Sequence, residues 1–420
     1  MHQQQIFNHT FSNGLVLVAQ SMPWLQSSAF AINVPAGCRY DPAEKIGLSN
    51  FACEMVQRGC GDLDSRQFIE ALEFKGIDYS SSSSVYHMRF GGAMRCEQLH
   101  DGLSIFADVL RRPHLTDDQL EDGRLVCFQE VRAIEDDLMQ RVMIELRNRH
   151  YGQPDGRDCH GTMDSIGSIT MEDIRGFFKD RFLPNGTIIS VAGKLDWEQL
   201  KDHVEYLFGD WKSGESAAIT AEPPQPGTHH IAFDSQQTQI CLAFPAVPYS
   251  HEDYYQSRGA VGVLSGGMSS RLFSEIREKR GLCYSVFATS TSTKDRGSVI
   301  CYSGTTAERA QETLDALIEQ LDGLKRGIEE DELTRLKVQI RSGLVMQQES
   351  CRSRASAIGV DWFHLGRIQL LDELNDIVNG LTVDSINRYL ENKPPGNYDL
   401  VTLGPEPLTL PNHEISTTSA

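Results

Sequence analysis

The chain has 420 residues, 40% of them hydrophobic and 23% charged, with a formal net charge of -19. This composition is typical of a globular protein with two or more buried cores, and it excludes a disordered chain. The negative charge argues against binding to nucleic acid or to anionic membranes, and the apolar runs are too short to span a bilayer. Because no Lys or Arg precedes Arg39, we expect neither a signal nor a transit peptide, and we expect a cytoplasmic protein whose ten cysteines are free thiols.

Apolar patterns predict strands and helices in both halves of the chain. Short apolar runs predict strands at 15–19, 28–34, 85–90, 240–244, 285–290 and 298–303. Apolar residues at helical spacing predict helices at 47–60, 65–74, 96–111, 117–150 and 306–327. Strand pairs followed by helix pairs are typical of an α+β fold, in which helices pack on one face of a sheet.

The second half of the sequence repeats the first. Three stretches recur in the same order and at nearly the same offset, namely 66–82 with 270–286, 169–178 with 381–390, and 184–193 with 395–404. Tandem copies of about 200 residues indicate two homologous structural units. The repeat also predicts that the run of serines at 80–84 is the start of a long strand, because its partner is strand-like.

The repeat defines the predicted domains. We expect an N-terminal domain at 1–211, a linker at 212–228 that is rich in Pro, Gly, Ser and Ala, and a C-terminal domain at 229–420. Each domain is predicted to be an α/β sandwich, in which helices cover a mostly antiparallel sheet. His229 and His230 follow the linker directly and are expected to face solvent.

The predicted helix at 47–60 has an unusual polar face. Its apolar face is made by residues at helical spacing, namely Leu48, Phe51, Ala52 and Met55. The opposite face carries Asn50, Cys53, Glu54 and Gln57, again at spacings of three, four and seven residues. This spacing is suited to metal ligands, although the residue types are unusual for that role.

The order of these features resembles that of the pitrilysin/insulinase family of zinc peptidases, the inverzincins. The chain is most similar to the short two-domain members related to mitochondrial processing peptidase and the bc1 core proteins. The matching stretches include FSNGLVLVAQSMP, INVPAGCRYDP, LEDGRLVCFQEVRAIEDD and, most specifically, GGMSSRLFSEIREKRGLCYSV. The resemblance covers nearly the whole chain and implies two α+β halves that enclose a chamber for a peptide.

The resemblance implies that the zinc motif is degenerate here. Active members carry H-x-x-E-H on the helix matching 47–60, with two His as zinc ligands and the Glu as general base. In this sequence those positions are Asn50, Cys53 and Glu54. The distal Glu ligand is kept as Glu130, whereas a helper Glu is replaced by Gly123. We therefore expect no metal site in this chain, with a makeshift Cys53, Glu54 and Glu130 site left open.

The resemblance implies the opposite for the second half. In active members the C-terminal domain supplies an Arg and a Tyr, spaced Arg-x6-Tyr, which hold the substrate and stabilise the oxyanion. Arg277 and Tyr284 have this spacing and are the predicted catalytic residues. In the repeat Tyr284 matches Tyr79, but Arg277 matches Leu72, which is expected to pack inward. The alternative is that Arg277 is a solvated surface charge.

Together these features predict the non-zinc subunit of a heterodimeric zinc metallopeptidase that degrades or processes peptides. The chain is expected to be inactive alone, to hold no cofactor, and to pair with a homologous subunit that carries the zinc. Neither nucleic acid nor membrane is an expected partner. One alternative is a catalytically inactive structural or interaction subunit of the same family. A further alternative is a self-sufficient peptidase with an unorthodox metal site.

Overall fold

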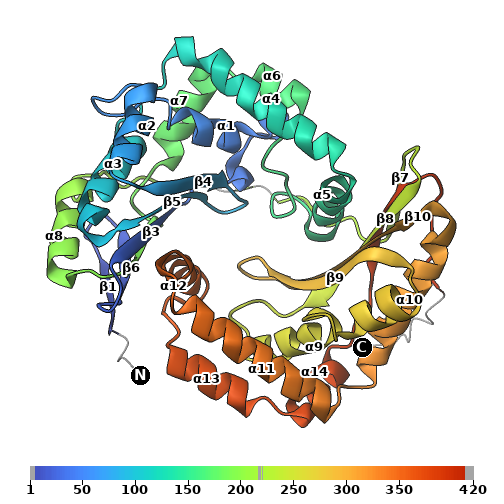
Figure 1. Ribbon diagram of the computed structural model, residues 1–420. Coiled ribbons are helices and arrows are strands. Elements are labelled where there is room, and N and C mark those ends of the chain that lie inside the picture. The colour runs from blue at the N-terminus through green and yellow to red at the C-terminus, as the bar shows by residue number, and fades with distance from the viewer. Residues whose placement is uncertain (1–4, 216–218, 220, 412–420) are drawn as a thin grey trace. The chain divides into compact units, whose positions relative to one another are not determined.

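The computed structural model describes residues 5–215, 219 and 221–411 (Figure 1). The predicted linker at 212–228 therefore lies partly outside the described residues, at 216–218 and 220. The chain forms two compact units. The first comprises Met1–Asp136, Gln153–Pro223 and Gly343–Glu373, and the second Asp137–Gly152, Pro224–Ser342 and Leu374–Ala420. No helix within the described ranges has both the length and the apolar character that a membrane crossing requires.

The first unit is built on a six-stranded sheet with the order β1-β2-β6-β3-β5-β4. Its strands are β1 (Gln5–Thr10), β2 (Val16–Ser21), β3 (Ser27–Val34), β4 (Asp78–Ser83), β5 (Met88–Arg95) and β6 (Ile188–Gly193). Neighbouring strands are antiparallel except for β2 and β6, which are parallel. The strand predicted at 85–90 begins later than expected, because a turn at 84–87 precedes β5.

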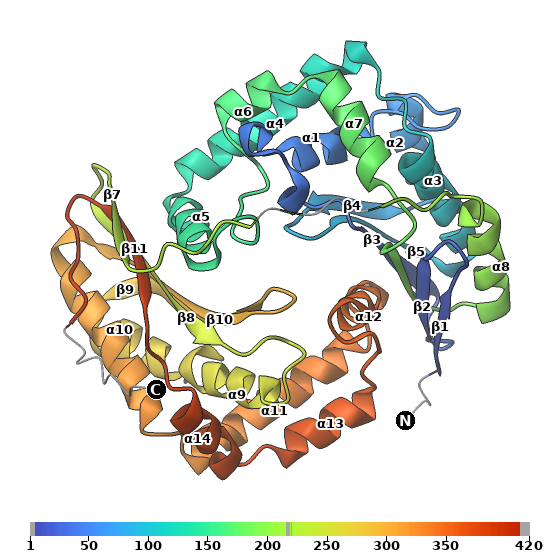
Figure 2. The same ribbon diagram turned by 180° about the vertical axis from the view of Figure 1, so that it is seen from behind.

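Side chains alternate between the two faces of this sheet. Phe30 and Ile32 of β3 point into the main core. The helices that contribute to this core include α1 (Leu48–Met55), α2 (Ser65–Phe74), α3 (Leu99–Arg111), α4 (Leu120–Asp136), α6 (Met163–Ser168), α7 (Met171–Arg181) and α8 (Trp197–Phe208). Ala29 of β3 points to the other face, which a single helix, α12 (Cys351–Leu365), covers (Figures 1 and 2).

The second unit repeats this plan on a five-stranded sheet with the order β7-β11-β8-β10-β9. Its strands are β7 (Thr228–Ala232), β8 (Gln237–Ala246), β9 (Cys283–Ser292), β10 (Gly297–Thr306) and β11 (Asp399–Gly404). The core on one face includes residues of α9 (Tyr254–Ser265), α10 (Ala310–Lys325), α11 (Glu330–Gln347) and α14 (Val383–Asn392), and α13 (Leu371–Gly380) precedes α14. The other face is covered by α5 (Leu138–Tyr151).

The strand orders confirm the predicted duplication and the α+β fold. The order β2-β6-β3-β5-β4 corresponds strand for strand to β7-β11-β8-β10-β9, and each begins with a parallel pair. The serine run lies in a strand as predicted, apart from its last member, but it forms the end of the six-residue β4 and not the start of a long strand. Thr170 and Thr382 form capping boxes at the starts of the matching helices α7 and α14.

The two units exchange equivalent helices. In each copy, the helix that covers the second face of a sheet comes directly after the long helix. Thus α5 follows α4, and α12 follows α11. However, α5 packs on β8 and β11 of the second sheet, whereas α12 packs on β3 and β6 of the first. The domains expected at 1–211 and 229–420 contain no such exchange. The helix predicted at 117–150 is also broken, because the Asp137 side chain accepts hydrogen bonds from Met139 N and Gln140 N and so caps a new helix.

A buried polar chain fastens α5 to the second sheet. His150 Nδ1 donates to Asp399 Oδ2 at 2.6 Å, and His150 Nε2 is hydrogen-bonded to Ser298 Oγ at 2.7 Å. The order of groups is that of a serine-protease triad, but Ser298 is only 2% exposed, within the interior strand β10. These hydrogen bonds therefore hold α5 against the sheet, since a buried polar group is stable only when it is paired.

Replacing His150 with alanine is expected to destabilise the protein by about 2–4 kcal/mol, because Asp399 loses a buried partner. Urea unfolding followed by circular dichroism measures this change. His229→Ala is the matched control. The His229 imidazole lies 3.5 Å from the carboxylate of Glu145 in α5, and both side chains are partly exposed. The expected loss of stability is therefore at most about 1 kcal/mol. Equal stability of His150→Ala and the parent would contradict the fastening role.

The prediction that His229 and His230 face solvent from a linker was wrong. Both lie in β7, which pairs in parallel with β11. His230 Nδ1 is 2.9 Å from Thr402 Oγ1, and both imidazoles are partly buried. The sequence there has no alternating pattern, and parallel pairing with a strand about 170 residues away leaves no local signal.

Candidate functional site

The start of α1, the helix with the degenerate motif, is fixed by Gly47 and by the side chain of Asp41. Gly47 has a φ of +96° and cannot be replaced without strain, since a Cβ there would lie 2.6 Å from the carbonyl oxygen of His160. The buried carboxylate of Asp41 accepts hydrogen bonds from Gly47 N and Ser49 N, both at 2.9 Å. Asp41 thus caps α1 from outside the helix and orients its polar face.

The predicted apolar face of α1 is buried as expected, with Leu48, Phe51, Ala52 and Met55 all in the core. Cys53 was expected on the polar face, but it is only 4% exposed. Burial raises the pKa of its thiol to about 12, so that Cys53 stays protonated at neutral pH. A protonated, buried thiol is not a general base.

The retained acidic residue at the distal ligand position is already engaged. Asn50 Nδ2 donates a hydrogen bond of 2.7 Å to Glu130 Oε2, which links α1 to α4. One of the two carboxylate oxygens of Glu130 therefore accepts an amide proton. Glu130 is also exposed, so that its carboxylate is stable without a cation.

Glu54, at the second histidine position, is paired with a residue that the sequence reasoning missed. Arg58 Nε donates to Glu54 Oε1 at 2.9 Å, and Arg58 Nη2 lies 2.8 Å from the same oxygen. Room for this arginine comes from Gly123, where a Cβ would lie 3.3 Å from Arg58 Nε and 2.5 Å from Met55 Sδ. The spacing of four residues between Glu54 and Arg58 was the available signal. A guanidinium thus supplies a positive charge next to the position of the lost zinc ligands.

These side chains do not fit a zinc ion. Zinc sites in proteins use imidazole, thiolate and carboxylate ligands, whereas here Asn50 is a neutral amide, Cys53 a thiol, and both glutamates are hydrogen-bonded within the chain. Across the residues that the structure describes, no three His, Cys, Asp or Glu side chains are grouped so that they could hold a metal ion. The makeshift site left open by the sequence is therefore not assembled in this geometry.

The predicted pair in the second half is brought together. Arg277 lies in a π-helical segment, η5 (Phe273–Lys279), and Tyr284 lies near the start of β9. The Arg277 guanidinium carbon is 4.6 Å from the centroid of the Tyr284 ring and 4.8 Å from that of Phe273. Both contacts are within the range of cation–π attraction. Tyr284 is 83% exposed, so that its ring and hydroxyl are accessible.

The repeat partners of this pair behave differently. Leu72 is buried in the first core, as predicted, and Tyr79 packs against the ring of Phe68 at 6.0 Å. The same two positions thus serve packing in one copy, whereas in the other copy they present a cation and a phenol at the surface. Packing does not account for Arg277 and Tyr284 in the way that it accounts for their partners.

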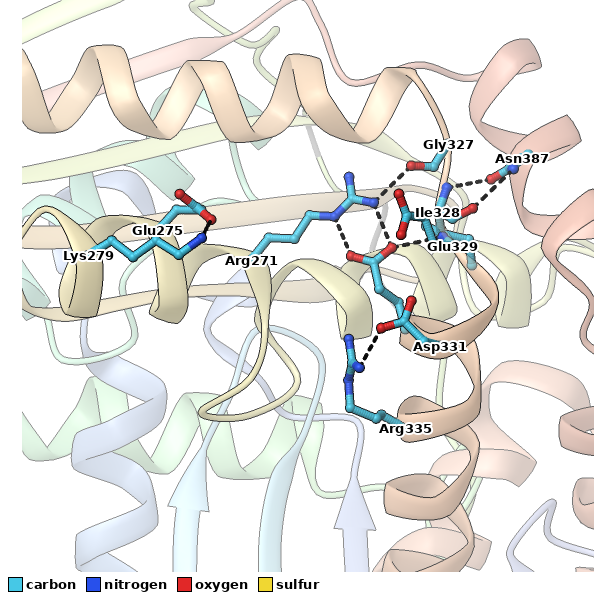
Figure 3. A network of polar contacts seen from close by, with 10 residues as sticks. Arg271, Glu275, Lys279, Gly327, Ile328, Glu329, Asp331, Arg335 and Asn387 are labelled. Carbon is cyan, nitrogen blue, oxygen red and sulfur yellow. Dashed lines mark hydrogen bonds and ion pairs between the residues drawn. The ribbon is translucent and has the colours of Figure 1, made fainter.

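The other cationic side chains near η5 form ion pairs with carboxylates. Arg271 donates from Nε and Nη2 to the carboxylate of Glu332, both at 2.7 Å, and from Nη2 to Gly327 O at 2.9 Å (Figure 3). Lys279 pairs with Glu275, as Figure 3 also shows. The contacts of Arg271 link the residues just before η5 to the start of α11, whereas the pair of Lys279 and Glu275 lies within η5.

Arg277 is the exception in this group. Arg280, the remaining cation, pairs with Glu319 at 2.6 Å. For Arg277, the described part of the chain offers two aromatic rings and no carboxylate within ion-pair distance. Its charge is therefore oriented by the rings without being neutralised, which suits the binding of an anionic or polarised oxygen.

Two family models match the chain. Residues 16–158 match the insulinase model, peptidase family M16, and residues 168–340 match the model of the peptidase M16 inactive domain. A protein of Bacillus subtilis (strain 168), named uncharacterized zinc protease YmxG, is 28% identical over 404 residues, which are 95% of this chain and 98% of that protein. The resemblance drawn from the sequence motifs is thereby confirmed.

Solved structures share the fold. The peptidase M16 inactive domain from Pseudomonas fluorescens has a TM-score of 0.88 at 21% identity, with 97% of this chain and 100% of that chain covered. A chain of complex III2 from Candida albicans has a TM-score of 0.81 at 16% identity, with 95% and 96% covered. Because the two family models together span well over half of the sequence, this chain belongs to the insulinase family of peptidases, family M16.

Proposed function

We propose that this chain is the zinc-free subunit of a heterodimeric zinc endopeptidase that cleaves peptides in the cytoplasm. In this proposal a homologous partner carries the zinc, and this chain contributes Arg277 and Tyr284 to the site. The observation that carries the proposal is the contrast between the two halves. The metal-ligand positions of α1 are engaged in internal pairs, whereas Arg277 is partly exposed beside the exposed ring of Tyr284 and lacks a carboxylate partner among the described residues.

The chemistry of the pair supports this role. Attack of water on a peptide carbonyl builds negative charge on the oxygen, and preorganised donors lower the barrier by stabilising that charge. Arg277 remains cationic at any physiological pH and offers several N–H donors in one plane. Tyr284 adds a neutral O–H donor on a rigid ring. The zinc of the partner would activate the attacking water. In this chain α1 cannot activate a water itself, because Cys53 stands at the position of the general base.

A second candidate function is that of a catalytically inactive structural subunit of the same family. The internal pairing of Asn50 with Glu130 and of Glu54 with Arg58 suits this reading equally well. A chain of complex III2 with the same fold shows that the architecture also occurs within a larger assembly. Arg277 favours the first candidate, since a purely structural subunit has no need of an unneutralised, oriented cation.

The purified chain alone is expected to retain no stoichiometric zinc after dialysis and to hydrolyse no peptide in a metal-dependent manner. Mixing it with a homologous chain that carries an intact zinc motif should give a one-to-one complex, seen by size-exclusion chromatography with light scattering, and new peptidase activity. The zinc-bearing chain alone is the control. A complex without activity would favour the structural subunit, and metal-dependent hydrolysis by this chain alone would refute both candidates.

A further inference from the structure

Two cysteines that are distant in the sequence meet in the first unit. Cys38 lies in η1 (Cys38–Tyr40), shortly after β3, and Cys159 lies in the loop at 152–162 that precedes α6. Their sulfur atoms are 2.8 Å apart. This separation is shorter than the roughly 3.5–4.0 Å at which non-bonded carbon atoms pack, and it exceeds a disulfide bond of about 2.05 Å by less than 1 Å. Elsewhere in the described ranges no two thiols are hydrogen-bonded to each other.

The backbones on both sides of this contact are held in place. Cys38 N donates to Ser84 O at 2.9 Å. Arg157 Nη1 donates to the carbonyl oxygens of Cys38, at 3.4 Å, and of Asp41. A Cβ on Gly161 would lie 2.2 Å from Ile46 O, so that the loop lies directly against the segment leading into α1. Because the backbones already meet, bond formation requires only small side-chain rotations.

We propose that Cys38 and Cys159 form a reversible disulfide that fastens the 152–162 loop to the segment preceding α1. The proposal rests on the proximity of the two sulfur atoms and does not depend on the function assigned above. Nothing in the sequence pattern pointed to it, because the two residues are separated by more than a hundred positions and lie in loops. Reversible disulfides of this kind are typical of redox-sensing proteins in reducing compartments.

The order of the two thiols in the reaction follows from their surroundings. Cys159 is partly exposed, whereas Cys38 is fully buried. The hydrogen bond with Cys159 and burial both raise the pKa of the Cys38 thiol well above its usual range. Cys159 is therefore the thiol that a dissolved oxidant can reach.

The reaction with a small disulfide such as oxidised glutathione balances in two exchanges. The Cys159 thiolate attacks one sulfur of the oxidant, which forms a mixed disulfide and releases one glutathione thiolate. Cys38 then gives its proton to that thiolate and attacks Sγ of Cys159, which releases the second glutathione. In total the two protein thiols lose two electrons and two protons, and the oxidant becomes two thiols.

The bond would stiffen the part of the unit that orients α1. Asp41 lies three residues after Cys38 and caps α1 through Gly47 and Ser49. The disulfide would close a covalent loop of more than a hundred residues, which constrains the unfolded chain. Oxidation is therefore expected to raise the melting temperature of the intact protein by at least about 4 °C.

Thiol mapping of the full chain tests the proposal. The protein is equilibrated with mixtures of reduced and oxidised glutathione, free thiols are alkylated, and tryptic peptides are analysed without reduction. Trypsin places Cys38 in the peptide 1–39 and Cys159 in 158–175, each as the peptide's single cysteine. A linked pair of these two peptides, which disappears on adding dithiothreitol, is the expected product.

Variants separate a specific disulfide from general thiol oxidation. Cys159→Ser is expected to abolish both the linked peptides and the temperature shift, and Cys38→Ala provides a second test if the first variant folds poorly. Cys96→Ser is the matched control, since this cysteine is also partly exposed and its thiol donates to the Glu97 carboxylate instead of to another thiol. It should leave both readouts unchanged. Glutathione attached to Cys159 without linkage to Cys38, or linkage scattered equally over other cysteines, would overturn the proposal.

Discussion

Replacing Arg277 with alanine is expected to lower the turnover of the assembled complex by about 10²–10³-fold without changing assembly. The guanidinium is oriented by the rings of Phe273 and Tyr284, so that it is preorganised before substrate binds. Removing one preorganised donor from an oxyanion removes stabilisation that the transition state receives and the ground state does not. The loss should therefore appear in kcat, measured with saturating peptide at fixed ratios of the two subunits.

Controls on the same segment distinguish this role from a general effect of charge. Lys279→Ala removes an exposed cation two positions away, whose partner is Glu275. It should leave turnover within about twofold of the parent. Tyr284→Phe keeps the ring beside Arg277 and removes only the hydroxyl, so that it isolates the second donor. If Arg277→Ala also stays within about twofold while assembly is normal, Arg277 is a surface charge and the structural subunit becomes the better reading.

The sequence predicted the architecture within each unit well, because the evidence for it is local or repeated. The internal repeat required matching strand orders, and the two sheets have them. The serine run at 80–84 would have been dismissed as low complexity without its repeat partner, yet it forms most of β4. The caps at Thr170 and Thr382 depend on side chains three residues away, so that they could be read directly.

The exchange of α5 and α12 could not be predicted from the sequence. Both helices carry apolar residues suited to covering a sheet, and the faces that they cover offer similar small apolar side chains, such as Ala29 and Ala243. Pattern alone does not say which of two equivalent faces a helix covers. The chain of His150, Asp399 and Ser298 specifies one of them, but it joins residues that are far apart in the sequence.

The candidate site was predicted in part, for a similar reason. The resemblance identified Asn50, Cys53, Glu54 and Glu130 as altered or retained positions, and Arg277 with Tyr284 as a pair. It did not reveal that Asn50 and Glu130 bond to each other, or that Arg58 occupies the space beside Gly123. Replaced catalytic residues acquire new partners through packing, and those partners have no motif.

Restoring zinc binding to α1 is expected to require the removal of Arg58 as well as the return of the ligands. Asn50→His and Glu54→His supply two imidazoles at a spacing of four residues, and Glu130 becomes available once Asn50 no longer donates to it. If Arg58 is still present, its guanidinium has lost the Glu54 carboxylate and lies next to the zinc ion. A unit charge and a dication about 4 Å apart repel by roughly 8 kcal/mol at a partly buried site, so that binding should remain weak.

The triple variant Asn50→His, Glu54→His and Arg58→Ala is therefore expected to hold about one zinc per chain, and to bind it at least about tenfold more tightly than the double variant that keeps Arg58. Zinc content after dialysis and competition with a chromogenic chelator measure both quantities, and circular dichroism checks folding. Cys53 is left unchanged, because a glutamate at this buried position would add a desolvation cost unrelated to metal binding. Adding Glu130→Gln to the triple variant should weaken binding, because the third ligand loses its charge. If the double and triple variants bind zinc equally, Arg58 does not oppose the metal, and the loss of the two histidines alone accounts for the degenerate site.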